Sequence, residues 1–250
     1  MDCPKCGALQ PDANAICDRC GIVFEKYWKY HPRPGERTAP EPPADSGDRP
    51  VGKGEGLRGL LLPIPADVDP VSTWARTALL GLLLIWGLAL IGSSVQSNAA
   101  GQSFLHLINL PFHEAGHILF RPLGAFMASL GGTLGQLLMP LICALVLLLR
   151  TRDPFGASVA LWWFGENFLD IAPYIGDARA GELPLVGGNF GHSAPYGFHD
   201  WEYLLTESGM LHLDHKLAQT SHLLGTAIML LALGWGALLV YRGLIAARRR

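Results

Sequence analysis

The residues best suited to chemistry in this sequence form the motif H-E-A-G-H at positions 113–117. On a helix, positions i and i+4 share a face, so His113 and His117 can bind one metal ion together. Glu114 lies about 100° further round the helix, beside that ion, where it can take a proton from water. Zinc lowers the pKa of a bound water toward neutrality, so the motif predicts a catalytic zinc site with Glu114 as general base. The alternative is a pair of packed histidines bonded to backbone carbonyls, because short motifs of this kind also arise by chance.

Four cysteines near the N-terminus form a second candidate metal site. They occur as two C-x2-C pairs, Cys3 with Cys6 and Cys17 with Cys20. Four thiolates in two tight turns close a tetrahedral structural zinc site that has no open position for chemistry. A glycine follows each pair, where the backbone needs a left-handed turn. Two disulfides or a redox dithiol are the alternatives, and a reducing compartment argues against disulfides.

The rest of the chain has the composition of a membrane protein. Of the 250 residues, 50% are hydrophobic and only 16% are charged, whereas a typical soluble domain has about 25% charged residues. Three tracts contain no Asp, Glu, Lys or Arg, namely 77–112, 122–149 and 217–241. Each is long enough for a helix that crosses the hydrocarbon core, which takes about 20 residues. No basic stretch is large enough to indicate a nucleic-acid partner.

We predict three parts along the chain. Residues 1–30 form a zinc ribbon, residues 31–70 form a Pro/Gly-rich linker with a short membrane-surface segment, and residues 71–250 form a membrane metalloprotease-like domain. The clear spans are expected at 74–95, 130–149, 155–175 and 222–241, with a polar loop over 177–216. The predicted fold class is an all-α polytopic membrane protein with about four to six membrane segments and a small N-terminal zinc ribbon.

Positively charged residues predict the topology. Arginines at 150, 152, 242 and 248–250 should face the cytosol. Four spans then leave both termini in the cytosol. The segment around His113 must enter and leave the membrane on one side, or be paired with another weak segment. We expect an integral membrane protein, and the resemblance described next implies a bacterial inner membrane.

The apolar setting of H-E-A-G-H resembles the site-2 protease family of intramembrane zinc metalloproteases, particularly its smaller bacterial relatives. The resemblance covers roughly residues 75–245, and the metal helix is its only highly specific piece. In that family an aspartate after an Asn and prolines supplies the third ligand. The resemblance therefore implies Asp177, which follows Asn167 and Pro173, or alternatively Asp170 in the middle of the span. We prefer Asp177, because Asp170 also suits a residue that orients a ligand histidine. The family's L-D-G sequence is not reproduced, since Ala178 follows Asp177.

The loop after Asp177 contains four histidines that could cap the site or bind a second ion. Their spacing is not ligand-like, so we expect them to be solvated loop side chains. They are His192, His199, His212 and His215. The polar span around Asn167 is expected to be broken at Pro173 and Gly176 and to line a hydrated pocket.

These observations predict a zinc-dependent metalloendopeptidase that hydrolyses a peptide bond in or near a membrane segment of a protein substrate. It would carry one catalytic and one structural Zn²⁺ ion, act in the lipid bilayer, and use its ribbon for docking a cytosolic protein partner or for regulation. The alternative is a non-catalytic membrane zinc protein of the same fold that acts as a partner-binding scaffold. A zinc transporter fits less well, because it would need ligands on several spans.

Overall fold

The computed structural model describes residues 1–31, 56–63 and 69–248. They fall into two compact units, one within 1–54 and the other within 55–250. We call them the cysteine unit and the helical unit. Most of the predicted linker over 31–70 lies outside the described residues. Eight α-helices occur in the described part of the chain: α1 (Phe24–Tyr30), α2 (Leu57–Leu61), α3 (Pro70–Ile91), α4 (Phe104–Phe120), α5 (Ala125–Leu149), α6 (Pro154–Gly176), α7 (Asp200–Glu207) and α8 (Asp214–Arg248).

The cysteine unit contains two turns with the same hydrogen-bond pattern, followed by α1. The N–H of Gly7 donates to the carbonyl of Cys3 at 2.8 Å, and the N–H of Gly21 donates to the carbonyl of Cys17 at 2.9 Å. Both glycines are left-handed, with φ of 69° and 70°. The predicted left-handed turns after each cysteine pair are therefore confirmed.

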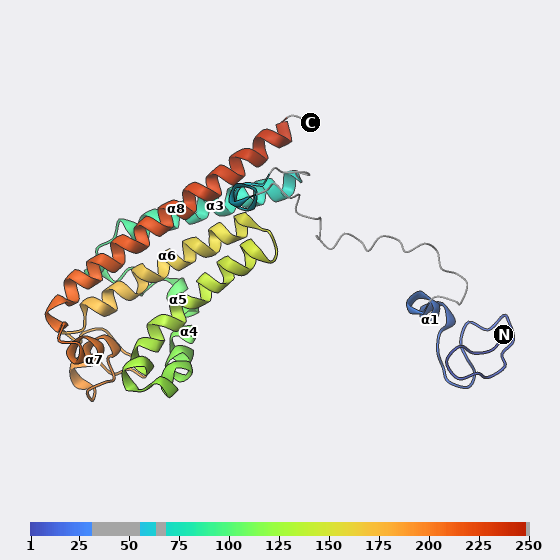
Figure 1. Cartoon of the computed structure of the whole chain (residues 1–250), viewed down its shortest axis with the longest axis horizontal. Coiled ribbons are helices and arrows are strands. Elements are labelled where there is room, and N and C mark those ends of the chain that lie inside the picture. The colour runs from blue at the N-terminus through green and yellow to red at the C-terminus, as the bar shows by residue number, and fades with distance from the viewer. Residues whose placement is uncertain (32–55, 64–68, 249–250) are drawn as a thin grey trace. The chain divides into compact units, whose positions relative to one another are not determined.

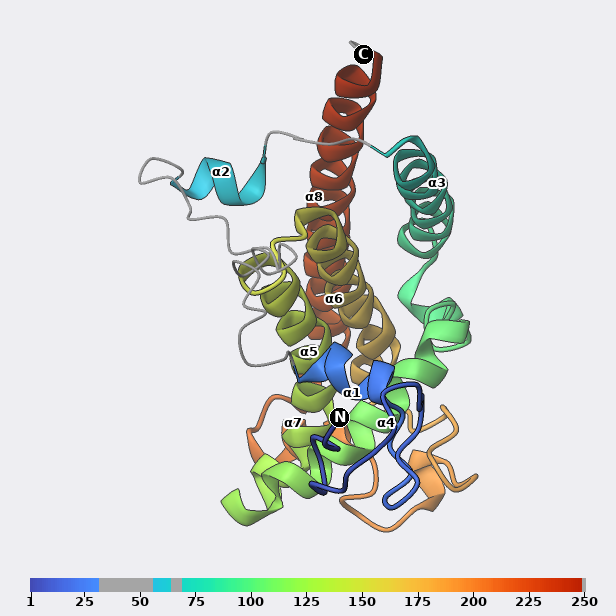
Figure 2. The same cartoon turned by 90° about the vertical axis from the view of Figure 1, so that its right-hand side faces the viewer.

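In the helical unit, α3, α5, α6 and α8 run alongside one another, while α4 and α7 lie at the end away from the C-terminus (Figures 1 and 2). Contacts link the start of α3 to the start of α6, where Arg76 lies 3.8 Å from Asp153. At the opposite end, the Arg179 guanidinium makes two hydrogen bonds to Asp214, of 2.6 and 2.7 Å. The Arg179–Asp214 pair links the chain just after α6 to the first residue of α8.

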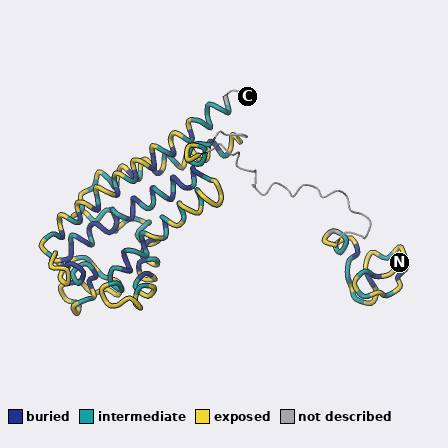
Figure 3. The backbone as a smooth tube through the Cα atoms, in the orientation of Figure 1, coloured by how far each residue is buried: buried dark blue, intermediate teal, exposed yellow. Residues whose placement is uncertain are grey.

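Three of the described helices are long and apolar enough to cross a membrane: Pro70–Ile91, Ala125–Leu149 and Leu211–Ala247, the last including the turn before α8. They support a membrane protein. The predicted span at 155–175 is the helix α6, which is not among the three, so the number of spans stays a prediction. α6 is the most buried of the four long helices (Figure 3).

Prolines affect α4 and α6 differently. Pro122 lies just beyond α4, which ends at Phe120 before a 3-10 turn over Arg121–Leu123. The expected break of the polar span is not observed at Pro173, because α6 continues through that residue, but the helix does end at Gly176. A proline lacks only one backbone donor, and the surrounding helices hold the segment in place. The 177–216 loop is also more ordered than expected, since it contains α7.

The paths of the four long helices generate a topological prediction. The starts of α3 and α6 meet at one end of the unit, and α4 lies at the other end, between the end of α3 and the start of α5. If all four helices cross the membrane, single-cysteine reporters at Arg250 and in the linker should be labelled from the cytosol, and reporters in residues 185–210 only from the opposite side. Labelling of Arg250 and the linker from opposite sides would mean an odd number of spans.

Candidate metal centre

The H-E-A-G-H helix is held against α5 by a close approach of two backbones. A Cβ atom added at Gly131 would lie 2.6 Å from the carbonyl oxygen of Gly116, and one added at Gly116 would collide with the backbone of Gly131. At Gly132 an added Cβ would lie 2.5 Å from Nε2 of His113 and 2.7 Å from Nε2 of His117. Only glycine at 132 leaves space in front of the two histidines.

That space is bounded on its other side by Asp200, the first residue of α7. Its Oδ2 atom lies 3.1 Å from Nε2 of His113 and 3.3 Å from Nε2 of His117. His113 and Asp200 are buried, and His117 is partly buried. The predicted pairing of the two histidines on one helix face is therefore observed, and a carboxylate from a distant segment completes a set of three.

The Nδ1 atom of each of the two histidines makes a hydrogen bond of its own. Nδ1 of His117 lies 2.8 Å from the carbonyl oxygen of Ala128, which can only accept a hydrogen bond. Nδ1 of His113 lies 3.2 Å from Oε1 of Gln136, whose Nε2 donates to Asp170 at 2.8 Å. Both Nδ1 atoms therefore donate, and in the neutral rings both Nε2 atoms carry lone pairs.

Two nitrogen lone pairs and a carboxylate oxygen thus face one another at hydrogen-bond distance. Such an arrangement is repulsive unless a cation, either a proton or a metal ion, lies between the atoms. Burial alone would raise the pKa of the Asp200 carboxyl, but hydrogen bonds from His113 and His117, which form when a proton is on Nε2, hold that pKa below its usual range. The donor set fits a metal ion, because both histidines are oriented by a second hydrogen bond.

The third-ligand residues expected from the resemblance lie elsewhere. The Asp177 carboxylate accepts hydrogen bonds from the N–H groups of Glu182 and Leu183, at 2.8 and 2.9 Å, and lies 3.3 Å from Nε2 of His199. Asp177 is therefore not placed against His113 or His117. It contacts the residue that precedes Asp200, so it positions the segment that carries the third acidic group.

His199 corrects the expectation that the loop histidines are solvated, since it is only 1% exposed. Burial holds the pKa of its imidazole below the usual range, although the neighbouring Asp177 acts in the opposite direction. Its Nδ1 accepts the N–H of Glu202 at 3.2 Å, which caps α7 and leaves Nε2 as the donor to Asp177. This pair fixes the start of α7, and with it the position of Asp200.

Asp170 belongs to a buried polar network behind His113. Its carboxylate accepts hydrogen bonds from Gln136, at 2.8 Å, and from Asn109, at 2.9 Å, and it lies 2.9 Å from Nδ1 of His106. Because Gln136 in turn accepts from His113, Asp170 fixes the orientation of that histidine through one intermediate side chain. Of the two roles considered for Asp170, the geometry favours orienting a ligand.

Glu114 is exposed on the wall of a cavity of ≈ 570 Å³ that His113, His117 and Asp200 also line. One of its carboxylate oxygens and a ring nitrogen of each histidine lie within 4.8 Å of one another. The His/Glu group could therefore hold a metal ion. Among the described residues, no hydrogen bond engages the Glu114 carboxylate. The cavity is also lined by His106, Tyr174 and an apolar segment, Leu183 to Val186.

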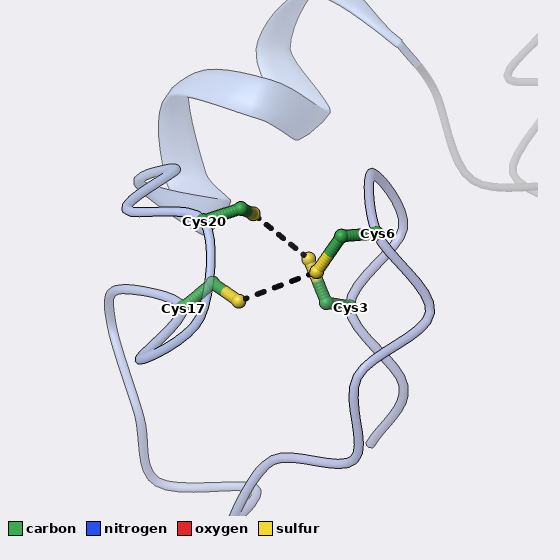
Figure 4. Close-up of side chains that lie close together, drawn as sticks. All are labelled: Cys3, Cys6, Cys17 and Cys20. Carbon is green, nitrogen blue, oxygen red and sulfur yellow. Dashed lines mark hydrogen bonds between the residues drawn. The ribbon is translucent and has the colours of Figure 1, made fainter.

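The four cysteines converge as predicted (Figure 4). Sγ of Cys3 lies 3.6 Å from Sγ of Cys20, and Sγ of Cys6 lies 3.8 Å from Sγ of Cys17, with no disulfide among them. Burial raises the pKa of the Cys3 thiol, but nearby backbone N–H donors outweigh it and lower the pKa to about 6. The Ile22 N–H lowers the pKa of the Cys20 thiol, but burial and the neighbouring thiols outweigh it and raise that pKa to about 12. A thiolate at Cys3 beside three further sulfur atoms could hold a metal ion.

Sequence reasoning missed four residues of the centre: Gly132, Gln136, Tyr174 and Asp200. Only Asp200 carried a signal, because it directly follows a histidine in the loop and begins an amphipathic stretch, D-W-E-Y-L-L. Gly132 and Gln136 look like ordinary residues of an apolar span, and their roles depend on which helix packs against α5.

Comparisons with protein-family models, curated proteins and solved structures found no match to this chain. The evidence for the centre is therefore its own geometry.

The crowding at Gly132 generates a prediction. Replacement of Gly132 by Ala places a methyl group between α5 and the two histidines, so the helical unit should lose its metal ion, with affinity lowered at least about 100-fold. Metal analysis of the full chain should fall from about two ions to about one. Gly81→Ala is the matched control, because a Cβ there meets nothing within 4 Å. Retention of both ions in Gly132→Ala would contradict this position for the metal.

The three aspartates can be ranked by metal affinity. The test uses a full-length chain in which the four N-terminal cysteines are replaced by serine, so that one site remains. Asp200→Ala should lower affinity far more than the 10–100-fold typical of a residue that orients a ligand, whereas Asp170→Asn should fall within about that range. Competition with a chelator measures each variant. A larger loss in Asp177→Ala than in Asp200→Ala would restore the family's order of ligands.

Proposed function

We propose that this protein is a membrane zinc metalloprotease in which His113, His117 and Asp200 hold the catalytic ion and Glu114 is the general base. The observation that carries the proposal is the open side of the three-ligand set, which faces a cavity that also contains Glu114. A structural zinc site is closed by four protein ligands, while a catalytic site keeps one position open.

Interatomic distances support zinc at both centres. Zinc binds nitrogen and oxygen ligands at about 2.0–2.2 Å and sulfur at about 2.3 Å, so the edges of its tetrahedra are about 3.3 Å and about 3.8 Å. Asp200 Oδ2 lies 3.1 and 3.3 Å from the histidine nitrogens. The two closest sulfur pairs are 3.6 and 3.8 Å apart. We propose a catalytic ion in the helical unit and a structural ion in the cysteine unit, which would serve as a docking or regulatory ribbon.

When bound, the zinc ion would supply a Lewis acid for a carbonyl group and acidify water. Glu114 takes a proton from water as the oxygen attacks the amide carbon, and the electron pair of the carbonyl moves onto its oxygen. Glu114 then delivers that proton to the amide nitrogen as the C–N bond breaks, which leaves a carboxylic acid and an amine. Gln136 and the Ala128 carbonyl hold the two histidines in the tautomer that this chemistry needs.

A protein substrate in or near the membrane is supported by the surroundings of the site. Three helices could cross a bilayer, and the cavity wall includes the apolar residues Leu183, Leu185, Val186 and Phe198. Apolar side chains of a substrate can be buried there. The resemblance of the H-E-A-G-H helix to site-2 proteases points to the same substrate class, although Asp200 stands outside that family's pattern.

The general base gives the sharpest test. Glu114→Gln should retain both zinc ions and lower turnover by at least about 10²–10⁴-fold, because it removes proton transfer and no ligand. The purified protein is reconstituted in liposomes with single-span membrane proteins, and cleavage products are identified by mass spectrometry. Glu207→Gln, an exposed change at the end of α7, is the control and should leave turnover unchanged.

Two results would reject the mechanism. One is turnover in Glu114→Gln within a factor of two of the parent with zinc bound. The other is an absence of cleavage in every parent preparation that contains two zinc ions. The second result would favour the non-catalytic scaffold.

A further inference from the structure

The side chain of Tyr174 contacts one of the three atoms that would hold the metal ion. Its hydroxyl oxygen lies 3.3 Å from Oδ2 of Asp200, the same oxygen that contacts both histidines. The ring is only partly buried, and it lines the cavity together with Glu114. The phenol therefore stands beside the place where a substrate carbonyl must lie if Glu114 and the three ligands act on it.

The Tyr174 hydroxyl oxygen accepts a strong hydrogen bond, whereas the hydroxyl hydrogen has only a long contact to an acceptor. The backbone N–H of Asp200 donates to the Tyr174 oxygen at 2.9 Å, a good hydrogen bond. The hydroxyl's own contact to Asp200 Oδ2 is 3.3 Å, longer than the usual range of about 2.5–3.0 Å for O–H···O. A small rotation can turn this hydrogen to a better acceptor in the cavity.

The ring itself is fixed. It packs on the His199 imidazole with centroids 4.3 Å apart and meets the His113 ring edge-on at 6.2 Å. His199 is in turn held by Asp177. A donor that is held in position before the reaction costs little reorganisation when charge develops nearby, which is the condition for transition-state stabilisation.

We infer that Tyr174 is a further catalytic residue, whose neutral phenol donates a hydrogen bond to the substrate oxygen as that oxygen gains negative charge. The inference rests on the proposed function. As water attacks and Glu114 takes its proton, the carbonyl electron pair moves onto oxygen, and the Tyr174 hydrogen turns from Asp200 to that oxygen. When the C–N bond breaks, the carbonyl re-forms and the hydrogen returns to Asp200. No proton leaves the phenol at any stage.

The test compares Tyr174→Phe with the parent, using a membrane substrate whose cleavage Glu114→Gln abolishes. Loss of one such donor should lower kcat by about 10²–10³-fold while KM and bound zinc stay unchanged. The affinity for a peptide phosphonamidate built on that substrate, which mimics the tetrahedral transition state, should fall by the same factor as kcat/KM. Affinity for the intact substrate, measured in the Glu114→Gln background, should not change. Tyr196→Phe, which removes a hydroxyl bonded to Glu207, is the matched control.

Each other outcome has a distinct meaning. Turnover of Tyr174→Phe within a factor of two of the parent rejects the role of Tyr174 and leaves the protease intact. Lower zinc affinity with activity restored by added zinc also overturns it, because the hydroxyl would then act only by positioning Asp200. If no substrate is found that the parent cleaves and Glu114→Gln leaves intact, the proposed function fails, and the role of Tyr174 fails with it.

Discussion

The centre depends on holding three electron-rich atoms against one another. Two imidazole nitrogens lie 3.1 and 3.3 Å from one carboxylate oxygen, and each repels that oxygen unless a cation lies among the three atoms. The fold keeps them together by three separate constraints. The crossing of α4 and α5 at glycines sets the depth of the histidines, the Nδ1 acceptors set their tautomers, and the Asp177–His199 pair fixes the residue before Asp200.

The buried polar groups on α6 follow from the same requirement. Asp170 would be costly in an apolar bundle unless its oxygens were satisfied. It is satisfied by His106, Asn109 and Gln136, and through Gln136 it orients His113. One polar side chain in the middle of α6 therefore helps to keep His113 in one orientation. This gives a reason why the most buried of the long helices carries an ionisable group in its interior.

The parts of this arrangement that local spacing determines could be predicted from sequence. Two C-x2-C turns and two histidines at i and i+4 need only their own backbone to converge, and both convergences are observed. The third acidic group could not be found this way, because Asp200 reaches the histidines from 83 or more residues along the chain, through the packing of α7 on α5. The family's order of Asn, Pro and Asp identified a residue that positions Asp200. The order of residues along the chain thus pointed to the right region, but the contact of Asp200 with the histidines depends on tertiary packing.

An intramembrane hydrolase needs water at its active site. The structure suggests a different route for that water from the one that the sequence suggested. A broken span was expected to admit water into the bundle, but α6 is continuous. α4 instead lies at one end of the unit (Figures 1 and 2), and its 17 residues are about 26 Å long, shorter than the ~30 Å hydrocarbon core. Polar loop segments on both sides of α7 lie at the same end. In the proposed protease, the scissile bond would therefore meet the metal near the membrane surface, where water is present and no helix needs to open.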